Sequence, residues 1–408
     1  MNVLYIGTFS GPSGYAVAAR GYFDLLASDP QINLKVINST SGAYGEEPRN
    51  LKDYILRTEN DVFEDYIVLY FIEPSYHYLE EASTEYSYQH DSEQAHKRPG
   101  INIKRILKNA SFSLSVVAWE AKGVPSEWID FISRYFNAVI VPSKFQNQNF
   151  SSQLKNIPVY TIPYVVKTSA SPPVASSKFR ILSSSQWSYR KGFDILIQAY
   201  LSEFFEQTDV ELTIKTFGIE SSRSALSEER NKIGREIQNY AVDCSRHQQF
   251  PKCQIKLWCG AVSSKAIDEL YDNCDLFATT TRGEGFGLTI AEAINKGKRV
   301  LVPDKGGHTD YIHPNNYLVK SRVETMRCST WSPSYSSEFK LIEPDFEDTR
   351  RKLREAYVEF NENQKTWKEK SQISNVFTKN YLSASRIKAN LLNVLTSKRS
   401  KKHCAGRY

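Results

Sequence analysis

Two series of short apolar segments, each alternating with segments of helical spacing, constrain the fold of this chain more than any other feature. The first series begins with an apolar strand at residues 2–7, a glycine-containing loop, a helix at 15–27 and a strand at 34–38. Further strands are expected at 66–71, 114–119 and 138–141. Strands that alternate with helices form mostly parallel sheets with helices on both faces.

The second series follows residues 166–178, whose Ser, Ala, Pro and Thr content is typical of an interdomain linker. Its expected strands lie at 179–183, 211–216, 255–258, 276–280 and 299–303, with helices at 193–201 and 266–273. We therefore predict an α/β protein with two Rossmann-like, doubly wound parallel-sheet domains, at 1–165 and 179–375, facing each other across a cleft. A helix at 376–396 is a candidate to pack back on the first domain, and 397–408 form a basic tail.

Composition favours a protein of the cytoplasm. The chain has 408 residues, enough for two domains, and a formal net charge of +6, which suits an anionic ligand but does not require one. The first residues read as a strand rather than a signal peptide, and no apolar run has the length of a membrane span. Six cysteines without metal-ligand spacing favour free thiols, and we predict no metal site.

A glycine-rich turn at 282–292 carries the strongest functional pattern. Glu284 stands inside the turn and Glu292 eight residues later, in the first turns of an expected helix. Glycines allow a sharp turn and a close approach of the backbone to a ligand, and the amides at a helix start bind anions. The segment therefore predicts a diphosphate cradle, with the two glutamates placed to accept hydrogen bonds from hydroxyls on either side.

A second glycine loop supports this interpretation. Gly306 and Gly307 follow the expected strand at 299–303, the next strand along the chain after the one that precedes the turn. Two glycine loops at neighbouring strand ends predict one shared site, because ligands of parallel sheets bind beyond the carboxyl ends of the strands.

At this point the chain resembles the retaining glycosyltransferases of the GT-B fold, close to family 4 (glycosyl transferases group 1). The shared pattern is Glu-Gly-Phe-Gly-Leu, seven residues between the two glutamates, and the following Gly-Gly loop. The resemblance implies that Glu284 lies beside the donor sugar, that Glu292 binds the ribose hydroxyls, and that the intervening backbone holds the diphosphate. The implied backbone residues are Gly285, Phe286, Gly287, Leu288 and Thr289.

The segment at 185–200 resembles the cationic loop of the same family. Lys191 followed by glycine fits its Lys-Gly, and such a lysine would neutralise the leaving diphosphate. Gln186 stands where the family has an arginine, so Arg190 is a candidate to supply that charge. Cations at a helix start oppose the helix dipole, which favours an anionic partner for both side chains.

The amino half matches the family more loosely. Gly11, Gly14 and Tyr15 follow the first strand as the family's glycine loop does, although a plain tight turn explains them nearly as well. Further candidates for the cleft or the acceptor site are His77, Glu120 and His308, each with a structural role as the alternative.

The resemblance implies a retaining, metal-independent hexosyl- or pentosyltransferase with a nucleotide sugar as co-substrate and no cofactor, UDP being favoured over GDP. The acceptor would be a hydroxyl of a glycan or glycolipid, and the enzyme would be cytoplasmic, or peripheral to the inner face of the membrane. One alternative is a phage-type enzyme that glycosylates modified DNA bases in a host cytoplasm, suggested by basic residues at 97–98 and 104–108. Others are a catalytically silent binding protein and an epimerase or phosphorylase. The oligomeric state stays open.

Overall fold

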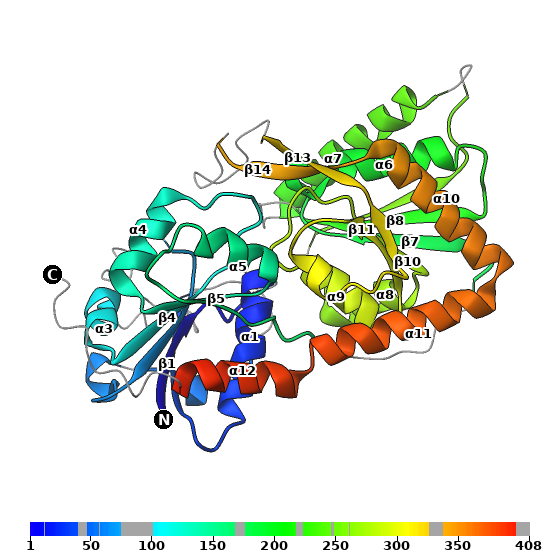
Figure 1. Ribbon diagram of the computed structural model, residues 1–408. Coiled ribbons are helices and arrows are strands. Elements are labelled where there is room, and N and C mark those ends of the chain that lie inside the picture. The colour runs from blue at the N-terminus through cyan, green and yellow to red at the C-terminus, as the bar shows by residue number, and fades with distance from the viewer. Residues whose placement is uncertain are drawn as a thin grey trace. The chain divides into compact units, whose positions relative to one another are not determined.

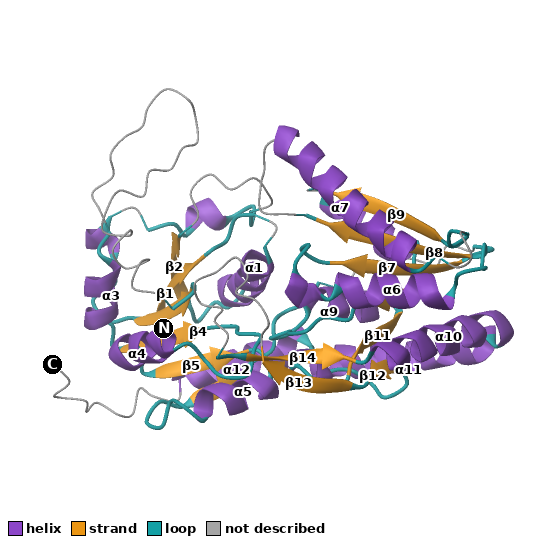
Figure 2. Cartoon of the chain, turned by 90° about the horizontal axis from the view of Figure 1, so that it is seen from above, coloured by secondary structure: helices purple, strands orange, loops and turns teal. Residues whose placement is uncertain are grey.

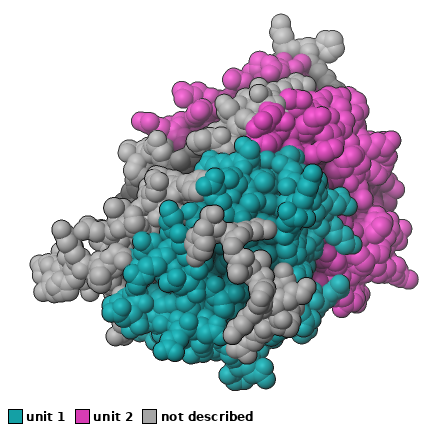
Figure 3. Space-filling model, turned by 60° about the vertical axis from the view of Figure 1, so that its left-hand side comes forward, with its two compact units in different colours: residues 1–119, 123–166, 382–408 teal, residues 120–122, 167–381 magenta. Residues whose placement is uncertain are grey.

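The computed structural model describes residues 1–11, 13–39, 47–56, 58–74, 101–167, 176–217, 223–245, 249–260, 262–325 and 338–396. The chain divides into two compact units (Figure 1 and Figure 3). Unit 1 comprises residues 1–119, 123–166 and 382–408, and unit 2 comprises 120–122 and 167–381. Residues 120–122 and 382–396 thus belong to different units from those that their order in the chain suggests.

Unit 1 is built on a parallel sheet of six described strands in the order β2-β1-β3-β4-β5-β6. The apolar residues of β1 (Asn2–Gly7) are fully buried, which is expected of a central parallel strand covered on both faces. The other strands are β2 (Asn33–Asn38), β3 (Ile67–Phe71), β4 (Phe112–Val116), β5 (Ala138–Val141) and β6 (Val159–Thr161). The described α-helices are α1 (Gly14–Ala27), α3 (Ile103–Asn109), α4 (Ser126–Tyr135), α5 (Lys144–Ser151) and α12 (Ala384–Thr396).

Unit 2 contains a second parallel sheet of six described strands, in the order β12-β11-β10-β7-β8-β9. These strands are β7 (Phe179–Ser184), β8 (Val210–Thr216), β9 (Gln254–Cys259), β10 (Leu276–Ala278), β11 (Arg299–Pro303) and β12 (Tyr317–Val319). The helices are α6 (Phe193–Glu203), α7 (Arg223–Asp243), α8 (Ser264–Asp272), α9 (Leu288–Asn295), α10 (Phe346–Glu362) and α11 (Gln364–Tyr381). Figure 2 shows β7, β8 and β9 side by side, with α6 and α7 next to them.

The strand order of unit 2 places its switch point between β7 and β10. From β7 the chain moves outward through β8 and β9, then returns to pair β10 against the other side of β7. The loops that follow β7 and β10 therefore diverge at this point, where doubly wound sheets bind their ligands. These are the loops that carry Lys191 and Glu284.

Three features of unit 2 differ from the expected elements. An antiparallel hairpin, β13 (Ser321–Thr325) with β14 (Lys340–Pro344), separates β12 from α10. The long helices α7 and α10 are polar at most positions, so apolar spacing does not reveal them. The single helix expected at 376–396 is wrong, because α11 ends at Tyr381 and α12 begins at Ala384 after the non-helical pair Leu382 and Ser383.

Helix α12 packs on α1 within unit 1, and Lys388 forms an ion pair with Asp29 at 3.1 Å. In the part of the chain that the structure describes, no helix is both long and apolar enough to cross a membrane.

Candidate functional site

The turn between β10 and α9 leaves the start of α9 open to an anion. Gly287 precedes the helix with a φ of 83°, and a Cβ on it would lie 2.9 Å from Ile290 Cδ1, so the position requires glycine. No side chain among the described residues caps this helix start. Because the first amides of a helix lack partners within the helix, Leu288 and Thr289 are suited to bind an anion.

The carbonyl groups of the same turn are bonded to the protein. The Gly283 carbonyl accepts a hydrogen bond from Arg190 Nη1 at 2.8 Å, and the Glu284 carbonyl accepts one from the Gly307 amide at 2.8 Å. Tyr311 Oη lies 2.7 Å from each of the carbonyl oxygens of Phe286 and Gly287. Negative ends of peptide dipoles are thereby held away from the turn's inner side, which favours a negatively charged ligand there.

Lys191 and Glu284 form a hydrogen-bonded ion pair between the two loops of the switch point. Their side chains are only 15% and 13% exposed. Burial by itself would raise the pKa of Glu284, but the neighbouring Lys191 and Arg190 hold it below its usual value. The pair is therefore ionic, and it leaves the ammonium within the same site as the open start of α9.

Gly192 fixes the place of Lys191. It adopts a φ of 69°, and a Cβ there would lie 2.0 Å from the carbonyl oxygen of Thr280. Thr280 follows β10, and its hydroxyl donates a hydrogen bond to the Gly192 carbonyl at 2.7 Å. The close backbone approach holds the lysine loop directly against the strand that leads into the glycine turn.

Arg190 joins the same loops from a buried position. Besides its bond to the Gly283 carbonyl, its Nη2 lies 3.3 Å from Glu120 Oε1. The structure thus brings Glu120 into unit 2, where the nearby Lys122 exchanges backbone hydrogen bonds with Lys340 of β14. Arg190 as a phosphate ligand and Glu120 as an acceptor residue stay predictions.

Arg282, which the sequence did not single out, is the most heavily bonded cation of the site. Its guanidinium forms two hydrogen bonds to Asp194, at 2.8 and 2.7 Å, and two to Glu343, at 2.6 and 3.1 Å. It also lies 3.9 Å from the ring centre of Tyr189. Arg282 therefore ties the glycine turn to the start of α6 and to β14.

Glu292 occupies the second turn of α9 with a tyrosine partner. Tyr271 of α8 donates a hydrogen bond from its hydroxyl to Glu292 Oε2 at 2.9 Å. The Glu292 side chain keeps partial solvent exposure, but its carboxyl group lies deep in the unit, and this burial raises its pKa to about 7. A carboxyl group in this state exchanges its proton near neutral pH.

His308 belongs to the Gly306-Gly307 loop and is fully buried. Its Nε2 lies 2.8 Å from the Pro303 carbonyl oxygen, so this nitrogen carries the proton and Nδ1 is an acceptor. Burial lowers the pKa of His308, which keeps the ring neutral. Nδ1 has no hydrogen-bond partner among the described residues.

The amino-half candidates lie in unit 1, after β1. Gly11 has a φ of 97°, and its carbonyl accepts a hydrogen bond from Arg20 Nη1 at 2.8 Å. Gly14 begins α1, and the Tyr15 hydroxyl donates to the Ala118 carbonyl at 3.1 Å.

Two other candidates are less informative. His77 lies outside the described residues, as do residues 97–98 of the basic segment. Gln186 is half-buried in the loop after β7, where the resemblance leads us to expect an arginine.

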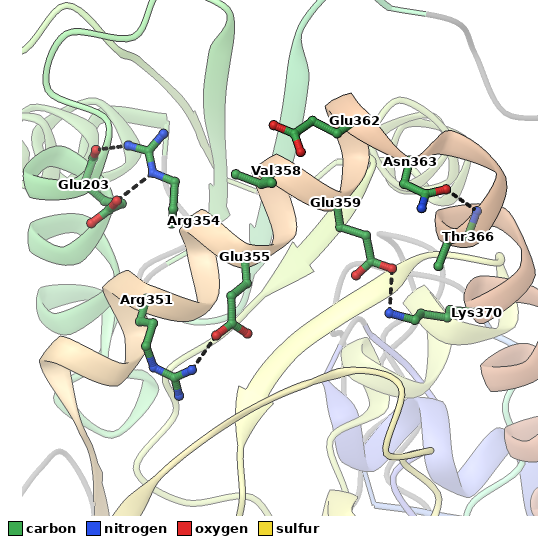
Figure 4. Close-up of a pocket in the computed structure, with 10 residues that line it drawn as sticks. All are labelled: Glu203, Arg351, Arg354, Glu355, Val358, Glu359, Glu362, Asn363, Thr366 and Lys370. Atoms are coloured by element: carbon green, nitrogen blue, oxygen red, sulfur yellow. Dashed lines mark hydrogen bonds and ion pairs between the residues drawn. The ribbon is translucent and has the colours of Figure 1, made fainter.

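A separate hollow of about 670 Å³ lies on α10 and α11 (Figure 4). Most of its charged side chains are paired with one another: Arg354 lies 2.7 Å from Glu203, and Lys370 lies 2.8 Å from Glu359. None of the predicted site residues lines it. Among the residues described, no three side chains of the His, Cys, Asp and Glu types are grouped to hold a metal ion.

Sequence reasoning missed the residues that hold the site in place. Tyr271 and Tyr311 contact the glycine turn or its helix, and Arg282 is the first residue of the turn, yet tyrosines are abundant in this chain and carry no motif. Only Arg282 offered a signal, because a charged residue close behind a buried strand needs a partner.

The family comparison matches residues 167–326 to the model described as glycosyl transferases group 1. The match covers the lysine loop, the glycine turn and α9. A comparison with curated protein sequences gave no match.

Solved structures resemble the chain at low sequence identity. A glycosyltransferase from Rickettsia africae is 14% identical with a TM-score of 0.62, covering 98% of this chain and 99% of its own. Trehalose-6-phosphate synthase, studied for glycosyl transfer with retention, is 9% identical with a TM-score of 0.62, covering 97% and 99%. A variant of S. aureus TarM in complex with fondaparinux, α-GlcNAc-glycerol and UDP is 16% identical with a TM-score of 0.57.

The structural match to TarM covers 83% of this chain, and this chain spans only 57% of the length of TarM. At these identities the likeness concerns the fold, and the two parallel sheets agree with it. The predicted α/β architecture is therefore confirmed: the chain has the GT-B fold of glycosyltransferases, and its residues 167–326 match the glycosyl transferases group 1 family.

Proposed function

We propose that this protein is a retaining glycosyltransferase that moves a sugar from a UDP-sugar to a hydroxyl of a glycan or glycolipid. The observation that carries the proposal is the buried Lys191–Glu284 ion pair beside the open start of α9, at the switch point of unit 2. A buried cation next to unpaired amides is suited to a diphosphate.

Each residue then has a defined task. The amides of Leu288 and Thr289 and the Lys191 ammonium bind the diphosphate. Glu284 accepts hydrogen bonds from hydroxyls of the donor sugar, and Glu292 accepts them from the ribose. The ion pair between Lys191 and Glu284 opens when the ligand supplies phosphate oxygens for the one and hydroxyl groups for the other.

The reaction needs no carboxylate nucleophile. The bond between the anomeric carbon and the phosphate oxygen breaks, and a bond from the acceptor oxygen forms on the same face of the sugar. The acceptor proton passes to the departing phosphate oxygen, so protons and charge balance. Lys191 and the amides stabilise the negative charge that develops on the diphosphate, which is how fixed dipoles and cations lower such a barrier.

The finer terms of the proposal rest on the family match and on analogy of fold. The TarM complex contains UDP, and the study of trehalose-6-phosphate synthase concerns transfer with retention. Metal independence and location in the cytoplasm are proposed on the same grounds, the family match and the analogy of fold.

A screen of nucleotide sugars by thermal shift tests the donor assignment. We expect one UDP-sugar to raise the melting temperature of the wild type, because a ligand at a hundred times its Kd stabilises a protein by about 3 kcal/mol. Lys191→Ala should abolish the shift, while Lys305→Ala should keep it, since Lys305 is a half-exposed lysine after β11 that pairs with Asp304. Equal shifts for both variants would contradict the proposal.

Turnover separates an active enzyme from the silent alternative. The wild type should release UDP slowly from the donor in water, faster with a suitable acceptor, and at an unchanged rate in EDTA. Nucleotide binding with no turnover on glycan, glycolipid or modified DNA would favour a silent binding protein, and loss of activity in EDTA would refute metal independence.

A further inference from the structure

Lys215 is a buried cation of unit 2 that has no carboxylate partner among the described residues; Lys298 also has none, but its Nζ donates a hydrogen bond to the Asp272 backbone carbonyl at 3.1 Å. Lys215 is the second-last residue of β8 and is 6% exposed. Arg282 has Asp194 and Glu343, and Lys191 has Glu284, whereas no carboxylate of the described residues pairs with Lys215. The ring of Phe217 lies beside its ammonium, with the ring centre 4.7 Å from Nζ.

A buried ammonium without a counter-ion weakens a fold. Removing the charge from water is costly unless a partner replaces the lost hydration. Burial lowers the pKa of Lys215, which is the expected sign of that cost. Proteins keep such residues mainly where a ligand supplies the partner.

Nearby buried hydroxyl groups also lack partners among the described residues. Ser185, Ser188 and Thr216 each have a buried hydroxyl oxygen with no hydrogen-bond partner among the described residues. All three lie at or just beyond the carboxyl ends of β7 and β8. Together with Lys215, they make four polar side chains at one edge of the sheet that lack hydrogen-bonding or ionic partners among the described residues. Such a group indicates a polar ligand at that edge.

The strand pattern shows which way Lys215 points. Val210, Leu212 and Ile214 pack into the core with α6, so the alternating Lys215 projects from the opposite face of the sheet. Right-handed connections place α8 and α9 on that opposite face, because the chain reverses direction across the sheet after β9. The contact with Phe217 shows that the ammonium reaches the carboxyl edge.

The same edge leads to the proposed diphosphate site. The Ser185 amide donates to the Lys215 carbonyl at 3.1 Å, and the Trp187 amide donates to the Phe217 carbonyl at 3.2 Å. The loop that ends in Lys191 therefore starts alongside Lys215. Across the sheet, the glycine turn follows β10 and the Gly306-Gly307 loop follows β11. Lys191 follows the next strand, β7, and Lys215 lies one strand further, on β8.

We propose that Lys215 selects the nucleobase of the donor by giving a hydrogen bond from its ammonium to a carbonyl oxygen of the base. The inference rests on the proposed function and names the specificity of the same site. Lysine has three donors and no acceptor. Uracil and guanine offer carbonyl oxygens, whereas adenine has none and presents an amino group, so Lys215 favours UDP or GDP and disfavours ADP.

Calorimetric titration of UDP, GDP and ADP into three proteins tests this assignment. For Lys215→Met we expect the affinity for the preferred nucleotide to fall about tenfold to a hundredfold, the usual effect of losing a charge-assisted hydrogen bond, with ADP affinity unchanged. Lys256→Met is the matched control, because Lys256 lies on the same sheet face of β9, is half-exposed and pairs with Glu211. It should bind all three nucleotides like the wild type.

Stability without ligand gives a second readout. Lys215→Met should unfold at a higher urea concentration than the wild type, because it removes a buried charge that has no partner. Lys215→Gln keeps a donor without the charge and should lie between the two proteins in nucleotide affinity.

Four results would overturn the inference. Unchanged selectivity in Lys215→Met, or a wild type that prefers ADP, would show that Lys215 does not read the base. A lower urea midpoint with unchanged affinity would make Lys215 a structural residue. If the wild type binds no nucleoside diphosphate, the proposed function fails and the inference with it. Lys191→Ala separates failure of the proposed function from failure of the Lys215 assignment. If Lys191 binds the diphosphate, this variant should lower the affinity for UDP, GDP and ADP by the same factor.

Discussion

Replacing Glu292 by glutamine should remove a pH dependence that the structure assigns to one carboxyl group. Burial raises the pKa of Glu292 from 4.5 to about 7. Between these values the folded protein binds more protons than the unfolded chain, so stability falls as pH rises through this window. The full effect is about 3 kcal/mol, and the partial exposure of the side chain reduces it to about 2 kcal/mol.

Urea unfolding at pH 5 and pH 8 measures the difference. The wild type should lose about 2 kcal/mol more than Glu292→Gln over this range, because the glutamine does not ionise. Glutamine still accepts the hydrogen bond from Tyr271, so the variant should fold normally. Other titrating groups affect both proteins equally and cancel in the comparison. Parallel pH profiles would refute the assignment.

Donor binding should show the opposite trend. If the ionised Glu292 accepts the ribose hydroxyls, binding requires the deprotonated form. The apparent affinity for a UDP-sugar should then weaken about tenfold from pH 8 to pH 6, because the competent fraction falls by that factor. The affinity of Glu292→Gln should be lower and nearly flat. An equal slope in both proteins would exclude Glu292 as the titrating ligand.

Two further substitutions test the framework of the site. Gly192→Ala should destabilise the protein by at least about 2 kcal/mol in urea unfolding, because the Cβ would clash with the Thr280 carbonyl. Gly234→Ala in α7 is the control: its Cβ would meet open space, so it should stabilise the protein by about 0.5–1 kcal/mol. Arg282→Met leaves Asp194 unpaired and should cost about 2–3 kcal/mol, with part of the loss recovered by adding Glu343→Gln. A neutral Arg282→Met, or no recovery, would contradict the pairing.

The donor half of the site could be predicted because its chemistry is local. Glu284, the glycines and Glu292 lie within eleven consecutive residues, and the turn from a buried strand into a helix fixes their relation. The Lys191 loop was found in the same way, since Gly192 directly follows it. Parallel strands then bring the two loops to one edge, which the strand–helix alternation already implies.

The supporting residues could not be predicted because their contacts are long-range. Tyr271 and Arg282 act on partners 21 and 61 residues away, through helix and strand packing that no periodicity encodes. Glu120 precedes its partner Arg190 by 70 positions. Its flanking sequence belongs to unit 1, although Glu120 itself belongs to unit 2. Lys215 was invisible for another reason: a lysine in a strand normally lies on a solvated face, and only the structure shows its burial.

The stereochemistry of transfer tests the central claim most directly. The UDP-sugar that stabilises the protein most is incubated with the wild type, and proton NMR follows the anomeric signal of the first product, before mutarotation. We expect the product to keep the anomeric configuration of the donor, with the rate reduced at least a hundredfold in Lys191→Ala, the usual scale for loss of a group that stabilises transition-state charge. A product of inverted configuration, or a full rate without Lys191, would contradict the account.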